Sequence, residues 1–464
     1  MKRLEIIRLS LLAVLLILHF SCSGPHRPNI LIITVDTLRA DYLGTYGDST
    51  AITPNIDALA RSATVFERAA APMPLTRPSH FSLLTAKYPR EHGVVNNAMA
   101  LPSEATTLTE ILQETGYETA AFLSVLLLAE DSGAAQGFST YDTPAEDNER
   151  SAERTIGRAL HWLEERESQG PFFLWVHLFD PHIPYAPPHE FRPAEVADSP
   201  AVTWARLNAI AADNGDNVPE QILEEAKQLY RGEIAYTDHW VGELLRGVDS
   251  QRQPQDTMVV FTADHGECFE NGSYFEHSDC LFEPAIRIPL IVRSAPTFPR
   301  GAQVETQTSI IDIAPTILRS IDIEIPSEFS GRPLQDSAAF ENRYVLIQHP
   351  LYQEKLTRVR PHRRRNIRSV AGEPRGEMLI DKERVGVVGG DWKYLRSGTD
   401  ERLYRITPDV DEKENLAEVN PEARAKMLDQ LRRELAQHPL QLIAPSEIND
   451  ELLKTLEALG YLDH

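Results

Sequence analysis

Residues 72–89 read PMPLTRPSHFSLLTAKYP, a stretch that places a hydroxyl, a helix start and a histidine close together. Pro78 suits the first turn of a helix, where its missing N–H is no loss, and Phe81, Leu84 and Tyr88 give that helix an apolar side. Thr76 is then expected at the positive end of a short buried helix, where free N–H groups favour a sulfate or phosphate group. An ordinary threonine at a helix N-cap is the alternative.

The same stretch resembles the signature of the sulfatases, a family within the alkaline-phosphatase superfamily. Their pattern is Cys or Ser, any residue, Pro-Ser-Arg and then Leu-Thr-Gly a few residues on. On this chain Thr76 takes the nucleophile position, Pro78 and Ser79 match, His80 stands in place of arginine, and residues 84–86 read Leu-Thr-Ala. Sulfatases oxidise the Cys or Ser to formylglycine, whereas oxidation of a threonine gives a ketone. The resemblance therefore implies that Thr76 is an unmodified nucleophile and that His80 steadies the anionic group.

Two apolar runs predict buried parallel strands that end in polar residues. Residues 30–35 lead to Asp36, and residues 257–262 lead through Ala263 to Asp264 and His265. Ligands gather at the carboxyl ends of strands in an open α/β sheet, so a carboxylate and an imidazole there can face one cation. The alternatives are an aspartate that caps the next segment and a structural Asp-His hydrogen bond.

Sulfatases bind metal at both of these places, usually calcium. The resemblance implies one divalent ion held by Asp36, Asp264 and His265, with the Thr76 oxygen completing the shell. Calcium is the expected ion, and magnesium, manganese and zinc also suit such ligands. Thr37 stands where the family has a second aspartate, so one carboxylate of the usual set is missing.

The remaining motifs contain three further histidines whose roles can be predicted. Residues 172–179 (FFLWVHLF) predict a third buried strand, which ends before His182, and this segment is similar to the sulfatase segment whose histidine protonates the leaving group. His177 lies inside the strand and is expected to pack in the core. His277 is a candidate for the rim of the site, with a solvated loop histidine as the alternative. The lysine that sulfatases place nearby has no counterpart in residues 278–280.

Composition limits the function classes. The hydrophobic content of 42% indicates a globular protein, and the formal charge of -23 argues against a nucleic-acid partner because a phosphate backbone would be repelled. After Cys22 only Cys268 and Cys280 remain, and these two can pair in an oxidising compartment.

The N-terminus predicts export. Basic residues precede an apolar run at residues 9–18, which is too short for a comfortable membrane span. Cys22 follows a small residue, as in a bacterial lipoprotein cleavage site, and simple secretion is the alternative. We therefore expect a periplasmic or outer-membrane lipoprotein, or a secreted protein, whose only membrane contact is a lipid anchor.

The pattern of strands and helices predicts an α/β fold, with a large, mostly parallel mixed sheet flanked by helices and a smaller C-terminal α+β domain. Helices are expected at residues 53–60, 106–114, 151–166 and 221–246, and a surface loop that shapes substrate choice at residues 184–219. The expected domains are a signal peptide (residues 1–22), a sulfatase-like catalytic domain (28–335), a small sheet-plus-helix unit (340–440) and a helical tail (441–464).

The resemblance implies a metal-dependent hydrolase of sulfate esters of a small molecule, glycan or lipid, in which Thr76 attacks in line and His182 protonates the alcohol. Hydrolysis of phosphate mono- or diesters, or transfer of a phospho-group, is the second hypothesis. The third is a binding protein that keeps the fold without the chemistry, which Thr37, His80 and Asp279 favour and the Asp264-His265 pair opposes.

Overall fold

The main sheet is the central element of the structure, a computed structural model. The structure describes residues 27–145, 148–168, 170–213, 217–250, 257–270, 273–278, 280–294, 296–351, 369–370, 383–441, 443, 452 and 454–456. The expected signal peptide, the arginine-rich sequence at residues 358–368 and most of the expected C-terminal tail lie outside these described residues. Within them the main sheet has nine strands, in the order β11-β2-β10-β7-β1-β5-β3-β4, with β12 paired to β2.

The strands of this sheet are β1 (Asn29–Val35), β2 (Thr64–Ala70), β3 (Glu118–Leu123), β4 (Thr140–Asp142), β5 (Phe172–Leu178), β7 (Thr257–Ala263), β10 (Arg287–Arg293), β11 (Ala302–Val304) and β12 (Thr308–Ser309). β10 pairs antiparallel with β2 and β7, and the other pairings are parallel. Every residue of β5 and β7 is buried, as continuous apolar runs require when helices cover both faces. The predicted fold class is confirmed.

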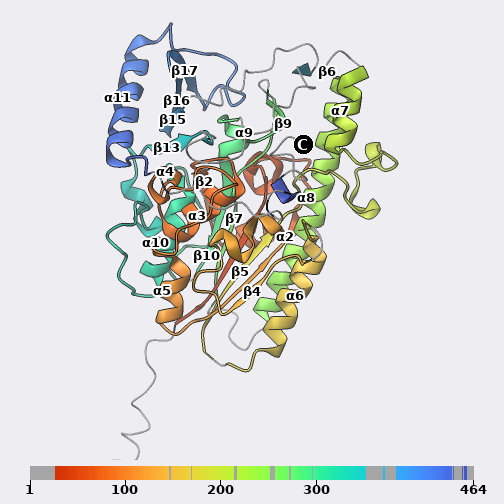
Figure 1. Ribbon diagram of the computed structural model, residues 1–464, viewed down its shortest axis with the longest axis vertical. Helices are drawn as coiled ribbons and strands as arrows, with labels where there is room; N and C mark the ends of the chain where they lie inside the picture. Colours follow the sequence, from red (N-terminus) through yellow and green to blue (C-terminus); the bar gives the residue numbers. More distant parts are fainter. Residues whose placement is uncertain are drawn as a thin grey trace, which may run out of the picture.

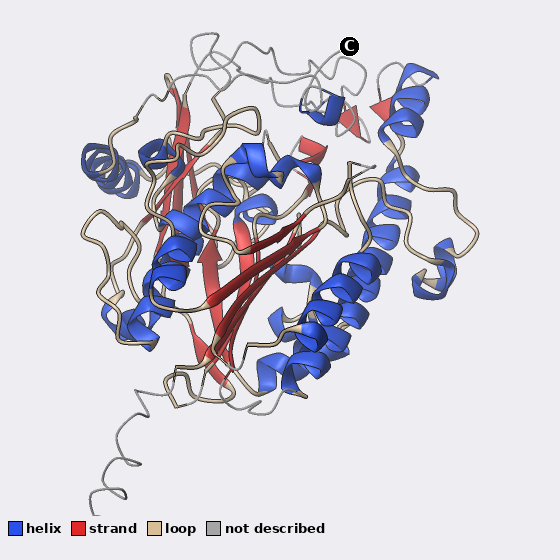
Figure 2. Ribbon diagram, turned by 60° about the horizontal axis from the view of Figure 1, so that its bottom comes forward, coloured by secondary structure: helices blue, strands red, loops and turns tan. Residues whose placement is uncertain are grey.

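Helices form one layer on each face of the sheet (Figures 1 and 2). One layer contains α2 (Pro54–Arg61), α6 (Ala152–Glu165) and α8 (Glu220–Asp249). The other contains α3 (Thr76–Thr85), α4 (Pro89–His92), α5 (Leu108–Glu114) and α10 (Ile313–Ser320). No helix in the described part of the chain combines the length and apolar character that a membrane span needs.

The segment expected as a plain surface loop, residues 184–219, contains a helix that the sequence did not predict. This helix is α7 (Trp204–Asp213), and Leu207 and Ala211 on it are fully buried. Pro, Asp and Asn around it indicated a loop, but two apolar residues one turn apart are enough to hold a short helix against the body.

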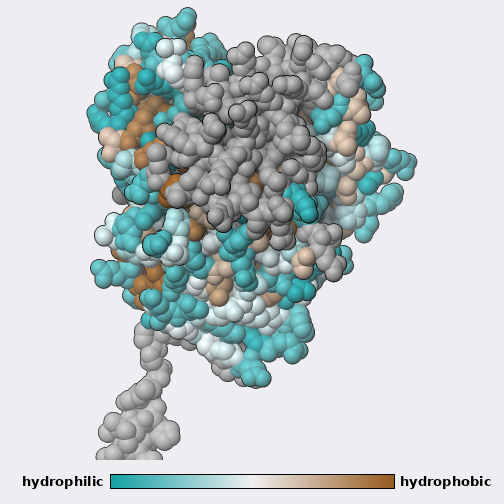
Figure 3. All heavy atoms as spheres, in the orientation of Figure 1, coloured by the Kyte–Doolittle hydropathy of each residue, from teal (hydrophilic) through white to brown (hydrophobic). Residues whose placement is uncertain are grey.

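A second, antiparallel sheet lies beside α11 (Pro421–Gln437) at the upper left of Figure 1. Its strands are β13 (Val345–Gln348), β15 (Arg384–Gly389), β16 (Trp392–Ser397) and β17 (Asp400–Arg405). The fully buried Lys393 of β16 places its Nζ 2.8 Å from Oε1 of Glu283, the first residue of α9 (Glu283–Ile286), and 2.8 Å from Oε1 of Glu412, which follows β17 in the chain. Where described residues are visible in Figure 3, the surface is mainly hydrophilic.

Candidate active site

The candidate site lies where β1 and β7 end side by side. Asp36 follows β1 directly, and Asp264 and His265 follow β7. Because the two strands are parallel neighbours, their carboxyl ends meet at one edge of the sheet. All three side chains are fully buried, and each offers a ligand atom within 4.8 Å of the other two. The structure therefore brings together Asp36, Asp264 and His265, which were predicted to bind a metal together with Thr76.

The electrostatics of this cluster favour a cation. His265 Nε2 lies 3.5 Å from Asp264 Oδ2 and 4.0 Å from Asp36 Oδ1, and none of these three atoms has a hydrogen-bond partner among the described residues. Burial raises the pKa of Asp36 to about 7, and burial followed by the charge of Asp36 raises the pKa of Asp264 well above its usual value. Two buried carboxylates with unpaired oxygens fit a divalent ion.

Backbone contacts orient the two ligands from β7. Asp264 Oδ1 accepts hydrogen bonds from the N–H groups of His265 (2.8 Å) and Thr37 (3.3 Å), which leaves Oδ2 for the site. His265 Nδ1 donates to the Gly266 carbonyl at 2.9 Å, so the neutral ring carries its lone pair on Nε2. A Cβ at Gly266 would lie 2.0 Å from the Pro284 carbonyl oxygen, so only glycine allows this close turn.

Thr37 occupies the position at which sulfatases usually have a second aspartate, as the sequence analysis noted. Its backbone lies in the left-handed region (φ 52°), and its carbonyl accepts a 2.6 Å hydrogen bond from the Tyr230 hydroxyl. The Thr37 hydroxyl is buried and has no hydrogen-bond partner among the described residues. The residue therefore contributes its N–H to Asp264 and adds no negative charge.

Thr76 is the first residue of α3, and its hydroxyl donates to Asp36 Oδ2 at 3.4 Å. The alternative of an N-cap threonine is wrong, because the N-cap is Leu75 and makes no side-chain capping bond. Every residue of α3 is buried, and the Ser79 hydroxyl donates to the Asp264 carbonyl at 2.6 Å. This contact fixes the start of the helix against the ends of β1 and β7.

His80 takes a different position from the one predicted. Its Nδ1 lies 2.8 Å from the Thr76 carbonyl oxygen, and its Nε2 lies 3.1 Å from the Thr34 hydroxyl. Burial, and then the neighbouring His177, lower the pKa of His80 well below its ordinary value. The prediction that His80 contacts the anionic group is therefore corrected. Both of its ring nitrogens bond to other protein atoms, and the ring holds the first turn of α3 against β1.

His182 and His277 lie next to the predicted metal ligands. The His277 ring stacks on His265 with centroids 4.5 Å apart, and its centroid is 5.4 Å from that of His182. His182 Nδ1 donates to the Ile183 carbonyl at 2.7 Å, and the ring stacks on Phe179. The solvated-loop alternative for His277 is wrong, because only 3% of the residue is exposed.

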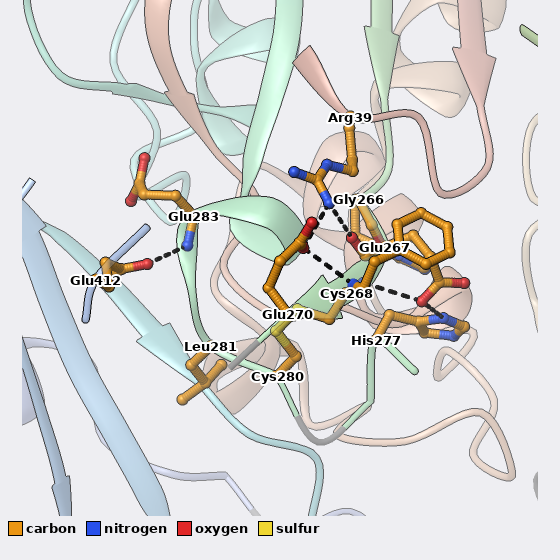
Figure 4. The surroundings of a disulfide bond; sticks show 12 residues. Arg39, Gly266, Glu267, Cys268, Glu270, His277, Cys280, Leu281, Glu283 and Glu412 are labelled. Atoms are coloured by element: carbon orange, nitrogen blue, oxygen red, sulfur yellow. Dashed lines mark hydrogen bonds and ion pairs between the residues drawn. A yellow bond between two sulfur atoms is a disulfide. The ribbon is translucent and has the colours of Figure 1, made fainter. Parts of the chain in front are cut away.

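A disulfide joins Cys268 and Cys280, so the two remaining cysteines do pair (Figure 4). It connects β8 (Cys268–Glu270) to the segment that follows His277. Glu267, beside Cys268, places Oε1 3.5 Å from His277 Nδ1 and accepts a 3.2 Å hydrogen bond from the Tyr185 hydroxyl. The sequence analysis missed Glu267, although its position directly after Asp264-His265-Gly266 was a usable signal. Asp279 lies outside the described residues.

His177 lies beside the candidate site as well as in the core, a proximity that the sequence analysis did not predict. It is fully buried in β5, as predicted for a core residue, but its Nε2 lies 3.6 Å from Asp36 Oδ2. Burial lowers the pKa of His177 to about 3. The sequence carried no local signal for this position, because only the register of β5 beside β1 places His177 opposite Thr34, two residues before Asp36.

The mostly parallel sheet, with a helix-start hydroxyl facing strand-end carboxylates at its edge, has an alkaline-phosphatase-like fold. Comparison with protein families narrows the class. The model of the family named Sulfatase matches residues 28–323, which is more than half of the chain. The chain belongs to the sulfatase family, a family of sulfuric ester hydrolases.

Relatives and solved structures agree with this assignment. The chain is 28% identical over 344 residues to an ulvan-active sulfatase of Formosa agariphila, a match that covers 67% of this chain and 65% of that protein. A structure in complex with D-glucosamine-2-N,6-O-disulfate has a TM-score of 0.70 at 19% identity, covering 89% of this chain and 98% of the other. The phosphonate monoester hydrolase of Agrobacterium radiobacter has a TM-score of 0.69 at 20% identity, covering 92% and 99%. The chain thus spans slightly less than two thirds of the first of these relatives.

Proposed function

We propose that this protein hydrolyses sulfate esters with Thr76 as an unmodified nucleophile. The observation that carries the proposal is the hydroxyl of Thr76 at the first residue of α3, which donates to Asp36 Oδ2 at 3.4 Å. Threonine at this position has no route to the formylglycine aldehyde, so its own oxygen is the group available for attack.

A divalent cation belongs to this proposal. Asp36, Asp264 and His265 would hold it, and the Thr76 oxygen lies beside Asp36 Oδ2. When bound, the ion supplies positive charge that favours deprotonation of the hydroxyl and neutralises a sulfate oxygen. Two carboxylates, an imidazole and a hydroxyl suit calcium, magnesium, manganese or zinc.

In the first step the Thr76 oxygen bonds to the sulfur of the ester, and the bond between sulfur and the alcohol oxygen breaks. The hydroxyl hydrogen of Thr76 passes to Asp36 Oδ2, its acceptor in the structure. His182 gives a proton to the departing alcohol oxygen, the role that its strand-end position supports.

In the second step a water oxygen bonds to the sulfur and the sulfur–Thr76 bond breaks. Thr76 recovers its proton from Asp36, and one water proton passes to His182. Hydrogen sulfate leaves and gives its remaining proton to solvent. His277, whose ring lies between Glu267 and His265, orients the rim of the site beside His182.

The proposed substrate is the sulfate ester of a glycan. Similar proteins support this class, since they include an ulvan-active sulfatase and proteins whose structures hold a glucosamine disulfate or a neocarrahexaose. The formal charge of -23 argues against nucleic acid as a partner. An exported, membrane-anchored form suits a polymer that is degraded outside the cytoplasm.

Phosphate ester hydrolysis or phospho-group transfer is the second candidate. The specific observation in its favour is the threonine at position 76, which cannot become formylglycine, together with the structural similarity to a phosphonate monoester hydrolase. In-line attack by a hydroxyl serves phosphorus as well as sulfur.

One experiment separates the candidates. Purified protein reconstituted with calcium, magnesium, manganese or zinc is given matched aryl sulfate and aryl phosphate esters, followed by sulfated oligosaccharides. We expect faster turnover of the sulfates. Faster turnover of the phosphates supports the second candidate, and no turnover of either class with any metal supports a binding protein that keeps the fold.

A further inference from the structure

Arg77, the second residue of α3, is a buried cation next to the candidate nucleophile. Only 1% of the residue is exposed, and it forms no ion pair with another described residue. Burial outweighs the charge of Asp131 and lowers the pKa of the Arg77 guanidinium to about 10, so the group stays charged at neutral pH. A buried charge is costly unless other groups compensate it, so the contacts that Arg77 makes in place of an ion pair have to be strong.

Those contacts are hydrogen bonds to backbone carbonyl groups outside the helix. Arg77 Nε donates to the Leu127 carbonyl at 2.6 Å, and Nη1 donates to the Met99 carbonyl at 3.1 Å. The backbone N–H of Arg77 also donates to Asn97 Oδ1 at 3.0 Å. Because hydrogen bonds from a charged donor are stronger than those between neutral groups, this one side chain ties the first turn of α3 to the segment around Met99 and to η3 (Leu126–Leu128).

The start of α3 is therefore held from two sides. Ser79 donates to the Asp264 carbonyl on the side of the candidate site. Arg77 and Ser79 are two positions apart, which places their side chains on nearly opposite sides of an α-helix. One hydrogen bond lets the turn pivot, whereas anchors on opposite sides fix it. Thr76 belongs to this turn, so the place of its hydroxyl, 3.4 Å from Asp36 Oδ2, depends on both anchors.

We propose that Arg77 is a positioning residue for the reaction: its guanidinium holds the first turn of α3 so that the Thr76 oxygen lies in line for attack. The inference rests on the proposed function, in which Thr76 is the nucleophile. The role is indirect, because the Arg77 side chain bonds to protein carbonyls and acts through Thr76. A displacement of about 1 Å can cost about a hundredfold in rate, so loss of the guanidinium should lower kcat and change KM little.

A cavity beside Arg77 allows a test by chemical rescue. Arg77 Nη2 has no hydrogen-bond partner among the described residues, and Arg77, Glu130 and Asp131 are among the residues that line this cavity of about 390 Å³. Carboxylates in the lining attract a cation. A free guanidinium ion is therefore expected to enter the space that Arg77→Ala leaves empty, whereas the longer side chain of Arg77→Met fills that space.

The test measures kcat and KM with the ester, sulfate or phosphate, that the native protein hydrolyses fastest. Arg77→Met keeps the apolar stem and removes the donors, so its kcat should fall about tenfold or more while KM changes less than about threefold. Arg77→Lys keeps one charged donor and should lose less. Millimolar guanidinium chloride should raise the kcat of Arg77→Ala several-fold and leave that of Arg77→Met unchanged.

The matched control is Arg150→Met. Arg150 is also buried and donates to a backbone carbonyl, that of Leu123, but its ion pair is with Asp142 and it makes no described contact with α3. This variant is expected to lose stability in urea unfolding and to keep its kcat. Equal falls in kcat for Arg77→Met and Arg150→Met, at equal loss of stability, would show that Arg77 only stabilises the fold.

The other outcomes separate this inference from the proposed function. Native kcat in Arg77→Met, or a loss confined to KM, overturns the positioning role, and where Arg77→Met does not fold, native kcat in Arg77→Lys without any effect of guanidinium on Arg77→Ala overturns it. These results leave the proposed function intact when Thr76→Ala is inactive. Near-native turnover of Thr76→Ala, or no turnover of any ester by native protein, overturns the proposed function and this inference with it.

Discussion

The hydroxyl oxygen of Thr76 lies 3.4 Å from Oδ2 of Asp36, although 40 positions separate the two residues in the chain. Asp36 directly follows the central strand β1, and Thr76 begins α3. Ser79, one turn further along α3, donates to the carbonyl of Asp264 at 2.6 Å and holds the helix start in this place. The candidate nucleophile is therefore fixed against the candidate metal ligands before any substrate arrives.

Thr76→Ala is expected to lower turnover by about a thousandfold or more, because it removes the attacking oxygen, while Thr76→Ser keeps part of the activity. Steady-state kinetics on the best ester measures both. Intact mass of the native protein should show no loss of hydrogen at Thr76, and a slow substrate should leave an adduct there. Near-native turnover of Thr76→Ala would mean that another group attacks.

Asp264→Ala is expected to remove tightly bound metal and activity while the fold persists, because one of two carboxylates in the cluster is lost. Metal analysis and circular dichroism measure this. Asp238→Asn is the matched control: Asp238 is also buried but accepts from the N–H groups at the start of α2, so this variant loses stability and keeps its metal. Unchanged metal stoichiometry in Asp264→Ala would remove the site.

His182→Gln is expected to lower turnover of alkyl sulfates by about a hundredfold or more, because their poor leaving groups need a proton. A nitrophenyl sulfate, whose leaving group departs without protonation, should lose much less. The ratio of the two kcat/KM values measures the effect. Equal losses on both esters would show that His182 positions the substrate and does not act as an acid.

His438 provides a pH-dependent contact between α11 and α4. Its Nδ1 lies 2.9 Å from Glu91 Oε1 and its Nε2 lies 3.6 Å from Glu434 Oε2. These carboxylates outweigh burial and raise the pKa of His438 from 6.5 to about 9. A raised pKa in the folded state means that the stabilisation is full below about pH 6.5, declines between 6.5 and 9, and is lost above about 9.

The measurement for His438 is urea unfolding of native protein and His438→Gln between pH 6 and 10. The difference in free energy of unfolding should be largest at the acid end and vanish near the alkaline end. His161→Gln is the control, since His161 is an exposed histidine on α6. A difference that does not change with pH would contradict the ion-pair origin.

Cys22→Ala is expected to move the protein from the membrane fraction to the soluble periplasm, if Cys22 carries a lipid. Fractionation of the expressing cells with an immunoblot measures the distribution. Identical distributions of the two forms would leave plain secretion as the explanation.

The sequence by itself determined the sheet and most of the metal-site candidates. Apolar runs before Asp36 and Asp264 identify strands buried on both faces, and parallel neighbours end at one edge, so strand-end side chains must converge. The Pro78 signal located the start of α3 to within two residues. These inferences need only local periodicity and the general geometry of parallel sheets.

Tertiary structure alone decided the roles of the inner histidines. His177 has the apolar surroundings of a core residue in the sequence, and only the register of β5 on β1 places it beside Thr34 and Asp36. His80 occupies the motif position of an anion-binding residue, but the Thr76 carbonyl and the Thr34 hydroxyl engage both of its nitrogens. The physical reason is that a side chain's hydrogen-bond partners depend on long-range register, which local sequence patterns do not encode.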